Sequence, residues 1–302
     1  MNVKRKSLPV AAVSAIILAI LVVFAGCSAK GTDNKQTDST DSASGGVSGQ
    51  ISVISREDGS GTRDAFTELM EITDDEGNDA TVQTAEITNS TSVMMSTVQG
   101  NEKAIGYVSL GSLSADVKAL KIDGVSPSAQ TVKDGSYTLQ RPFKIAYSED
   151  KLSDAAKDFI SFIMSQEGQA IINEEGYIGV DATSSYEAKN ISGKITLAGS
   201  TSVAPVMNVL ADKYKQLNPE AVVEIQESGS SAGIESALSG AVEIAMSSRE
   251  LKDDEKAALK DETIALDGIA VIVNKANTAD NVTSAQIKAI FKGETTKWED
   301  VK

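Results

Sequence analysis

The sequence contains no histidine among its 302 residues. Histidine is the most frequent general base, the usual activator of a serine or cysteine nucleophile and the commonest protein ligand of metal ions. Its absence argues against most hydrolases. A phosphatase with Ser60 or Thr62 as nucleophile would also lack a histidine base and an obvious metal cluster. We therefore expect a protein that is not an enzyme.

Cysteine occurs once, as Cys27. A single thiol supports neither a disulfide framework nor a thiolate zinc site. The acidic stretch at residues 74–79 is the remaining candidate for a cation site, but its carboxylates do not have the alternate spacing of a calcium loop. A solvated turn explains this stretch better, and we expect no metal and no cofactor.

Positive charge is scarce, with a formal net charge of -15. This balance argues against a nucleic-acid partner, because binding a phosphate backbone requires a positive surface. It does not exclude a small anion, since a few donors aimed into a pocket set the local field there. The length and the 41% hydrophobic content predict a globular chain of about two domains.

The longest apolar run lies near the N-terminus, at residues 10–24, after the positive residues Lys4, Arg5 and Lys6. This pattern predicts a secretory signal. An uncleaved transmembrane helix is the alternative, but the run is shorter than the roughly 20 residues that a membrane span prefers. The following residues, Phe-Ala-Gly-Cys at 24–27, resemble a bacterial lipobox, in which the cysteine becomes lipidated and N-terminal after cleavage.

Residues 1–27 are therefore expected to be a lipoprotein signal peptide that ends at the lipidated Cys27. Residues 28–49 contain mostly Ser, Thr, Asp, Gly and Lys, so they cannot offset the entropy of ordering by burial and predict a flexible linker. A diacylglycerol-type lipid on Cys27 would supply two acyl chains, which suffice for stable membrane attachment. The folded part is thus expected to be extracytoplasmic, anchored to the outer face of the bacterial cytoplasmic membrane.

The remaining sequence alternates strand-like and helix-like patterns. Apolar strand patterns lie at residues 51–54, 194–197, 222–225 and 269–273, and helical spacing follows Thr62, Ser153, Pro205 and Ala232. This alternation predicts an α/β fold in which helices cover the sheets.

Three similar turn-to-helix junctions carry hydroxyls and glycines, at residues 58–63 (DGSGTR), 199–205 (GSTSVAP) and 228–233 (SGSSAG). The start of a helix offers unpaired N–H groups and partial positive charge, and glycine lets an anion approach the backbone. One such junction is better explained as an ordinary N-cap. Three of them, together with Arg56 and Arg249, favour an oxyanion site, because arginine matches tetrahedral oxyanions.

These residues also carry a family resemblance. Residues 194–302, with the motifs ITLAGSTSVAP, ESGSSAGI, EIAMSSRELKDDE, ALDGIAVIVN and IFKGETTKWEDV, resemble the first half of the phosphate-binding proteins of phosphate ABC importers. Residues 50–186, with ISVISREDGSGTRDAF, AIGYVSLG and YTLQRPF, are similar to the second half of that family. The resemblance implies a two-lobed, type II periplasmic-binding-protein-like fold with the ligand cleft between the lobes.

The order of the halves departs from the family, so the sequence reads as a circular permutant with the old termini joined near residues 188–193. The expected continuous lobe comprises residues 106–271, and the expected split lobe comprises residues 50–105 and 272–302. A permutation is tolerated when the joined ends are close and the new break is exposed. The alternatives are a fragment of a longer tandem protein and a chain that completes its lobe with another protomer.

The resemblance implies one set of phosphate ligands from each lobe: Thr201, Ser202, Ser230 and Ser248 on one side, and Arg56, Ser60, Gly61 and Thr62 on the other. Well-known members have an acidic residue at the position of Ser248. Ser248 can accept a hydrogen bond but cannot repel sulfate by its charge. Asp58 could supply part of that rejection, or it could pair with Arg56.

Arg249 either touches the ligand or braces its loop, and Ser231 is a further candidate ligand. Arg141 lies outside the three junction motifs and is therefore expected to matter less for binding than Arg56.

The resemblance implies that the protein binds inorganic phosphate and delivers it to the permease subunits of an ABC importer. The alternative is a cell-surface sensor of phosphate or other oxyanions, or an adhesion protein, with the same fold and no transport role.

Overall fold

The structure is a computed structural model that describes residues 47–182 and 184–301, all of which belong to one unit of the chain. The predicted signal peptide, Cys27 and nearly all of the predicted linker lie outside the described residues. No helix within the described ranges is long and apolar enough to span a membrane.

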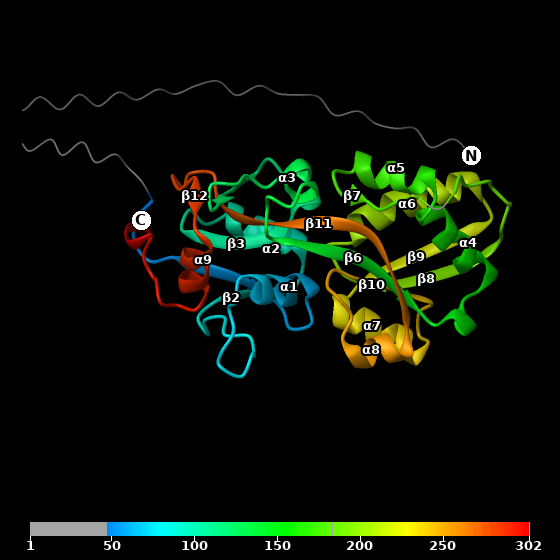
Figure 1. The fold of residues 1–302 in the computed structure, drawn as a ribbon, viewed down its shortest axis with the longest axis horizontal. Helices are drawn as coiled ribbons and strands as arrows, with labels where there is room; N and C mark the ends of the chain where they lie inside the picture. Colours follow the sequence, from blue (N-terminus) through cyan, green and yellow to red (C-terminus); the bar gives the residue numbers. More distant parts are fainter. Residues whose placement is uncertain (1–46, 183, 302) are drawn as a thin grey trace, which may run out of the picture. The chain divides into compact units, whose positions relative to one another are not determined.

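A ten-stranded mixed sheet runs through the molecule in the order β2-β1-β3-β11-β6-β10-β8-β9, and β4 and β7 also pair with β11 (Figure 1). Its strands are β1 (Ser52–Arg56), β2 (Glu86–Thr88), β3 (Ala104–Ser109), β4 (Val117–Ala119), β6 (Gln140–Tyr147), β7 (Ile178–Gly179), β8 (Gly193–Gly199), β9 (Ala221–Glu227), β10 (Ile244–Ser247) and β11 (Lys260–Asn274). A separate two-stranded sheet pairs β5 (Lys121–Ile122) with β12 (Asn281–Val282).

Strands β6 and β11 connect the two halves of the sheet. They pair antiparallel from Lys260↔Tyr147 to Gly268↔Gln140, and β11 then continues alongside β3 and β4. On the other side, β6 pairs with β10. One half of the sheet therefore reaches the other through these two crossing strands, which are long and nearly continuous in Figure 1.

Lobe 1, residues 141–267, has a large core between the sheet and the helices α4 (Asp154–Ile163), α5 (Gln166–Glu174) and α6 (Ala204–Leu217). On the opposite face, α7 (Ser230–Ser239) and α8 (Asp253–Ala258) cover a smaller apolar cluster that includes Ile234 and Leu259. A short 3-10 helix, η2 (Glu149–Lys151), precedes α4. The sheet of lobe 1 is thus covered on both faces, as the strand and helix patterns predict.

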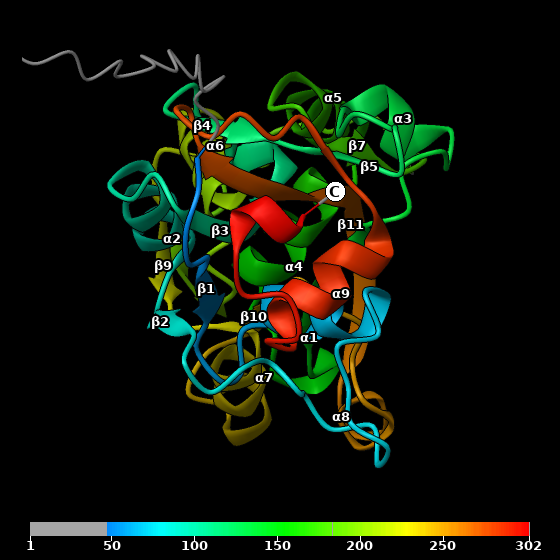
Figure 2. The same ribbon diagram turned by 90° about the vertical axis from the view of Figure 1, so that its left-hand side faces the viewer.

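Lobe 2, residues 47–140 and 268–301, also has helices on both faces. Figure 2 views this lobe end-on, with α1 (Gly61–Leu69) and α9 (Ser284–Phe291) on one side of β1 and β3, and α2 (Thr91–Gln99) on the other. Phe66 and Phe291 meet edge to face at 4.8 Å between ring centroids. Shorter elements complete the lobe: η1 (Leu110–Ser112), α3 (Ala129–Lys133) and η3 (Trp298–Asp300).

The cores divide at the crossing strands and not at the expected boundaries after residues 105 and 271. Tyr107, Leu120 and Tyr137 are buried in the same core as Ile51 and Phe291. The physical reason is that β3 pairs with both β1 and β11, which keeps the chain in lobe 2 until β6 carries it across.

The acidic stretch at residues 74–79 forms a turn closed by its own side chains. The Asp74 carboxylate accepts hydrogen bonds from the backbone N–H groups of Glu76 and Asn78, at 3.0 and 2.8 Å. These bonds, above all those from Asn78, lower the pKa of Asp74. Among the residues that the structure describes, no group of acidic or cysteine side chains is arranged to hold a metal ion.

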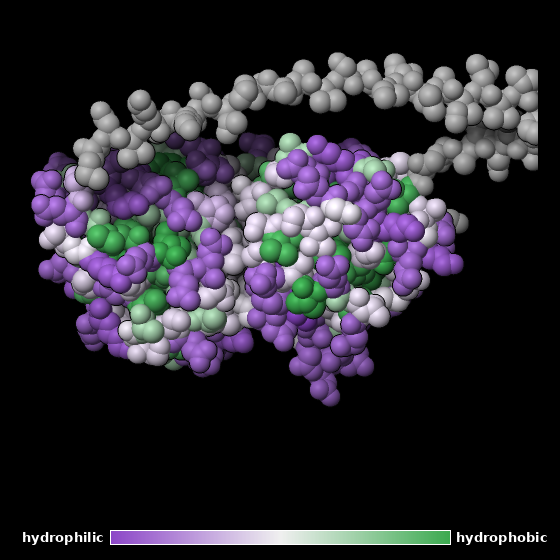
Figure 3. Space-filling model, turned by 180° about the vertical axis from the view of Figure 1, so that it is seen from behind, coloured by the Kyte–Doolittle hydropathy of each residue, from purple (hydrophilic) through white to green (hydrophobic). Residues whose placement is uncertain are grey.

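The face seen in Figure 3 is mostly polar or charged, and its apolar residues form small separate patches. Such scattered apolar residues are normal on a protein surface and need no bound partner to explain them.

Candidate functional site

Each of the three predicted junctions does begin a helix. Ser60 caps α1, with its Oγ 3.5 Å from the N–H of Arg63. Thr201 and Ser202 precede α6, which has proline in its first turn, and Gly229 precedes α7 with a φ of 88° that suits glycine. The start of α1 belongs to lobe 2, whereas the starts of α6 and α7 belong to lobe 1.

The side chains at these helix starts meet across the boundary between the lobes. Thr62 Oγ1 lies 2.8 Å from Ser202 Oγ, and Arg56 Nη2 donates to Thr201 Oγ1 at 3.1 Å. The backbone N–H of Ser231 donates to the Gly59 carbonyl at 3.1 Å. The structure therefore brings all three junctions into one buried cluster, as the sequence predicts.

The site has two walls, one formed by its residues from lobe 1 and one by its residues from lobe 2. Gly61 allows these walls to come this close. A Cβ at this position would lie 2.5 Å from Ser230 Oγ and 2.8 Å from Ser248 Oγ, which is closer than real Cβ atoms approach. The Ser230 hydroxyl also accepts a hydrogen bond from the backbone N–H of Ser248, at 3.2 Å. A larger residue at Gly61 would push the start of α1 away from these two serines.

Arg56 ends β1 and supplies a guanidinium group to the cluster, with only 2% of the residue exposed. Its Nε and Nη2 donate to the Glu57 carboxylate at 2.7 and 2.6 Å. A buried cation needs such a partner, because desolvation is costly and a guanidinium fork matches a carboxylate. Pairing with Arg56 was one of the two roles that the sequence left open for Asp58, and in the structure Glu57 holds that position.

Asp58 lies outside the cluster. Its side chain is 98% exposed and forms an ion pair with Arg63 at 2.8 Å. It therefore contacts neither Arg56 nor the serine and threonine side chains of the site.

Ser248 is fully buried on the wall that lobe 1 contributes. Its Oγ accepts a hydrogen bond from Ser200 Oγ at 2.9 Å and lies 3.4 Å from Ser230 Oγ. Hydroxyl groups both donate and accept hydrogen bonds, so this group of serines can adapt to a protonated or an unprotonated oxygen.

Arg249 turns away from the cluster and braces its loop. Its two terminal nitrogens donate to the Glu255 carboxylate, both at 2.8 Å, and Nη2 also donates to Ser231 Oγ at 3.2 Å. The bonds with Glu255 raise the pKa of Arg249 and lower that of Glu255. Of the two roles left open by the sequence, these contacts favour bracing. Ser231 serves as one of its anchors.

Sequence reasoning missed Thr91, the first residue of α2. Its Oγ1 lies 3.2 Å from both Thr201 Oγ1 and Ser202 Oγ, and its backbone N–H donates to Thr201 Oγ1 at 3.3 Å. A fourth helix start thus joins the cluster, from lobe 2. The run Asn-Ser-Thr-Ser at residues 89–92 is a cap signal, but it lacks the glycine on which the other three were recognised.

Arg141 lies outside the three junction motifs in the sequence, but in the structure it stands directly behind Ser248. Its Nη1 donates to the Ser248 carbonyl at 3.3 Å, and its Nη2 lies 3.0 Å from Asp267. Both side chains of this pair are only 1% exposed, and they face each other across β6 and β11. Burial raises the pKa of Asp267, and the adjacent Arg141 opposes that shift.

Asp267 connects this pair to lobe 2, because its carboxylate also accepts from Ser109 Oγ at 2.9 Å. The crossing strands therefore place one buried ion pair in contact with the Ser248 carbonyl in lobe 1 and with Ser109 at the end of β3 in lobe 2.

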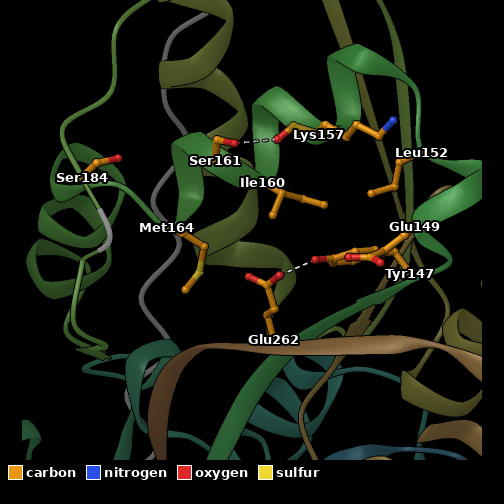
Figure 4. A pocket seen from close by; sticks show the side chains of 9 residues that line it. All are labelled: Tyr147, Glu149, Leu152, Lys157, Ile160, Ser161, Met164, Ser184 and Glu262. Carbon is orange, nitrogen blue, oxygen red and sulfur yellow. Dashed lines mark hydrogen bonds between the residues drawn. The ribbon is translucent and has the colours of Figure 1, made fainter. Parts of the chain in front are cut away.

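A separate pocket of about 590 Å³ opens on lobe 1, over α4 (Figure 4). Apolar side chains of Leu152, Ile160 and Met164 line it, together with Lys157 and the hydrogen-bonded pair of Tyr147 and Glu262. It contains none of the predicted site residues, and its mixed lining lacks the converging hydroxyls of the cluster.

The chemistry of the cluster suits an oxyanion. Four helix starts, several hydroxyl groups and one guanidinium converge, and each is a donor that can replace the water around an anion. The carboxylate nearest to Arg56 is engaged in an ion pair. Such an array is suited to binding, since it presents donors without an unpaired general base beside them.

Comparison with known proteins identifies the family to which the chain belongs. The model of the PBP superfamily domain matches residues 3–167 and 184–302. "Phosphate-binding protein PstS 2" of Streptococcus agalactiae is 45% identical over 303 residues, which covers 99% of each chain. "Phosphate-binding protein PstS" of Staphylococcus haemolyticus is 34% identical over only 121 residues, 37% of this chain and 38% of its own.

A solved structure agrees with these sequence relatives. The phosphate-binding protein of a phosphate ABC transporter from Streptococcus pneumoniae shares 48% of its residues with this chain, at a TM-score of 0.68. The match covers 84% of this chain and all of that one. The prediction of a two-lobed periplasmic-binding-protein-like fold is thereby confirmed. The chain belongs to the PBP superfamily and, within it, to the family of phosphate-binding proteins of phosphate ABC transporters.

Proposed function

We propose that this protein binds inorganic phosphate outside the cytoplasmic membrane and delivers it to the permease subunits of an ABC importer. The observation that carries the proposal is the buried cluster in which side chains of both lobes meet, notably Arg56 with Thr201 and Thr62 with Ser202. The names of the streptococcal relatives supply the ligand and the transporter.

In this mechanism, phosphate sits between the two walls and replaces their direct contacts. Thr201, Ser202, Ser230 and Ser248 bind it from lobe 1, and Arg56, Ser60, Gly61, Thr62 and the newly found Thr91 bind it from lobe 2. A ligand that contacts both walls stabilises the closed arrangement by its differential affinity. The closed arrangement is then what the permease recognises.

The site also offers acceptors for a protonated phosphate oxygen. Ser248 has no charge, but its hydroxyl oxygen and that of Ser230 can accept a hydrogen bond that a protonated phosphate oxygen donates. Sulfate carries no such proton at neutral pH, so it can accept hydrogen bonds from these hydroxyls but cannot donate one. Protonated phosphate therefore gains a hydrogen bond that sulfate lacks, which favours phosphate over sulfate.

Calorimetric titration tests this function. The purified protein is expected to bind inorganic phosphate saturably, with one phosphate per chain, and to bind sulfate more weakly. Absence of saturable phosphate binding would refute the proposal, and equal binding of both anions would refute the selectivity argument.

Arg56 is expected to be the strongest single contributor among the ligand residues. Arg56→Ala should weaken phosphate binding roughly 10- to 100-fold, because it removes a charged donor from a buried site. Lys215→Ala is the control, since Lys215 pairs with Asp212 on the surface of α6. Similar losses in both variants, measured by calorimetry, would contradict this site assignment.

We further propose that the chain, whose order its full-length streptococcal relative shares, is a circular permutant of other family members such as the Staphylococcus protein. Residues 49–51 lie beside residues 296–299: Trp298 N donates to the Gly49 carbonyl, and Gln50 and Lys297 form an antiparallel bridge. In the usual order these segments would be joined. The short match to the Staphylococcus protein supports the proposal, because a collinear alignment of two permuted chains follows only one part.

Restoring the usual order tests the permutation. A chain in which residues 191–301 precede residues 47–188, with a short glycine-serine connection, should fold and bind phosphate with unchanged affinity. The melting temperature and the phosphate titration measure this. A reordered chain that stays unfolded would argue against the permutation.

Attachment to the membrane forms the last part of the proposal. The lipobox-like residues 24–27 and the polar residues 28–49 support lipidation at Cys27 and a tether to the outer face of the cytoplasmic membrane.

Fractionation of a bacterium that produces the full chain tests the anchor. The wild-type protein should incorporate labelled palmitate and sediment with membranes, whereas Cys27→Ser should do neither. Ser28→Ala, which keeps the thiol, should behave as the wild type. Palmitate label in Cys27→Ser would contradict lipidation at Cys27.

A further inference from the structure

Arg249 makes a contact that the proposed ligand site does not use. Besides Glu255 and Ser231, its guanidinium lies next to Asp64 on α1, with 3.0 Å between Nε and Oδ2. Glu255 belongs to α8 and Ser231 to α7, both in lobe 1, while Asp64 belongs to lobe 2. One side chain therefore touches three helices and both lobes.

The contacts of Arg249 differ in what happens to them when the lobes separate. Those with Glu255 and Ser231 lie within lobe 1, so they hold the guanidinium in place whether or not the lobes touch. The contact with Asp64 crosses the boundary and must break on opening. The Arg249 guanidinium is thus held in place on lobe 1, and it pairs with Asp64 of lobe 2 only in the closed arrangement.

Asp64 is placed to complete this pair without touching the ligand. It follows Thr62 by two positions on α1, and residues two apart on a helix point to different sides. Burial raises the pKa of Asp64, while Arg249 and Lys252 of lobe 1 and Arg63 of lobe 2 act in the opposite direction. A groove of about 600 Å³, lined by residues of both lobes that include Asp64 and Arg249, runs beside the pair and leaves it open to water on that side.

We propose that the Arg249–Asp64 ion pair is a latch that stabilises the closed arrangement and slows the release of the bound anion. The latch rests on the proposed function for its role in phosphate release, but its effect on closure does not require any ligand. Asp64 and Arg249 are in this sense positioning residues, because they act through the approach of the two walls.

The experiment compares Asp64→Asn with the wild type in two measurements. Fluorescence energy transfer between dyes at Asp75→Cys in lobe 2 and Ser239→Cys in lobe 1, in a Cys27→Ser chain, reports the separation of the lobes without ligand. Stopped-flow release of inorganic phosphate reports the dissociation rate. Without ligand, the energy-transfer efficiency of Asp64→Asn should shift toward the value for separated lobes. Its phosphate dissociation rate should rise about three- to tenfold, as expected for loss of a partly exposed ion pair.

Glu71→Gln is the matched control, because Glu71 lines the same groove but pairs at 2.9 Å with Lys288 of its own lobe. It should leave both measurements unchanged, and Asp64→Glu should restore most of the wild-type behaviour. Unchanged transfer and release in Asp64→Asn would overturn the latch. If the wild type fails to bind phosphate, the proposed function is refuted. The comparison of energy transfer between the wild type and Asp64→Asn without ligand still decides for or against the latch.

Discussion

The arrangement depends on one constraint, which is that polar groups buried between two lobes must find partners there. Arg56, Thr62, Ser202, Ser230 and Ser248 are all almost inaccessible to solvent. Each makes at least one hydrogen bond within the cluster, and the bonds of Arg56 with Thr201 and of Thr62 with Ser202 cross between the lobes. Because an unsatisfied buried donor or acceptor is expensive, this network favours one relative placement of the helix starts. The same donors are then available to any oxyanion that takes the place of these mutual contacts.

The crossing strands make that placement geometrically attainable. Strand β11 pairs with β6 in lobe 1 and with β3 in lobe 2, so a single strand carries the register from one half to the other. At the crossing, Arg141 and Asp267 add a buried ion pair that reaches the Ser248 carbonyl on one side and Ser109 on the other. The crossing strands and the loop that carries Ser248 are therefore linked through buried charges.

Local sequence signals predicted much of the site, and the parts they missed depend on long-range pairing. Hydroxyl and glycine residues before an apolar helical repeat identified the starts of α1, α6 and α7, because caps and helix propensity are local properties. Thr91 was missed because its junction has no glycine. Arg141 reaches Ser248 only through the alignment of β6 with β10 and β11, which no local pattern encodes. The lobe boundary was misplaced for a similar reason, since the pairing of β3 with β11 decides where the chain crosses.

The burial of Trp298 has a spectroscopic consequence. It is the only tryptophan in the sequence, it is 6% exposed, and its indole N–H donates to the Lys103 carbonyl at 2.9 Å. Trp298 packs in the core of lobe 2, where residues 49–51 lie beside residues 296–299. The aromatic residues in the main core of lobe 1 are phenylalanines and tyrosines. Excitation at the red edge, where tyrosine does not absorb, therefore isolates the emission of lobe 2. In a denaturation experiment, tryptophan emission would follow the docking of the two chain segments, while near-ultraviolet signals from tyrosine would follow mainly lobe 1.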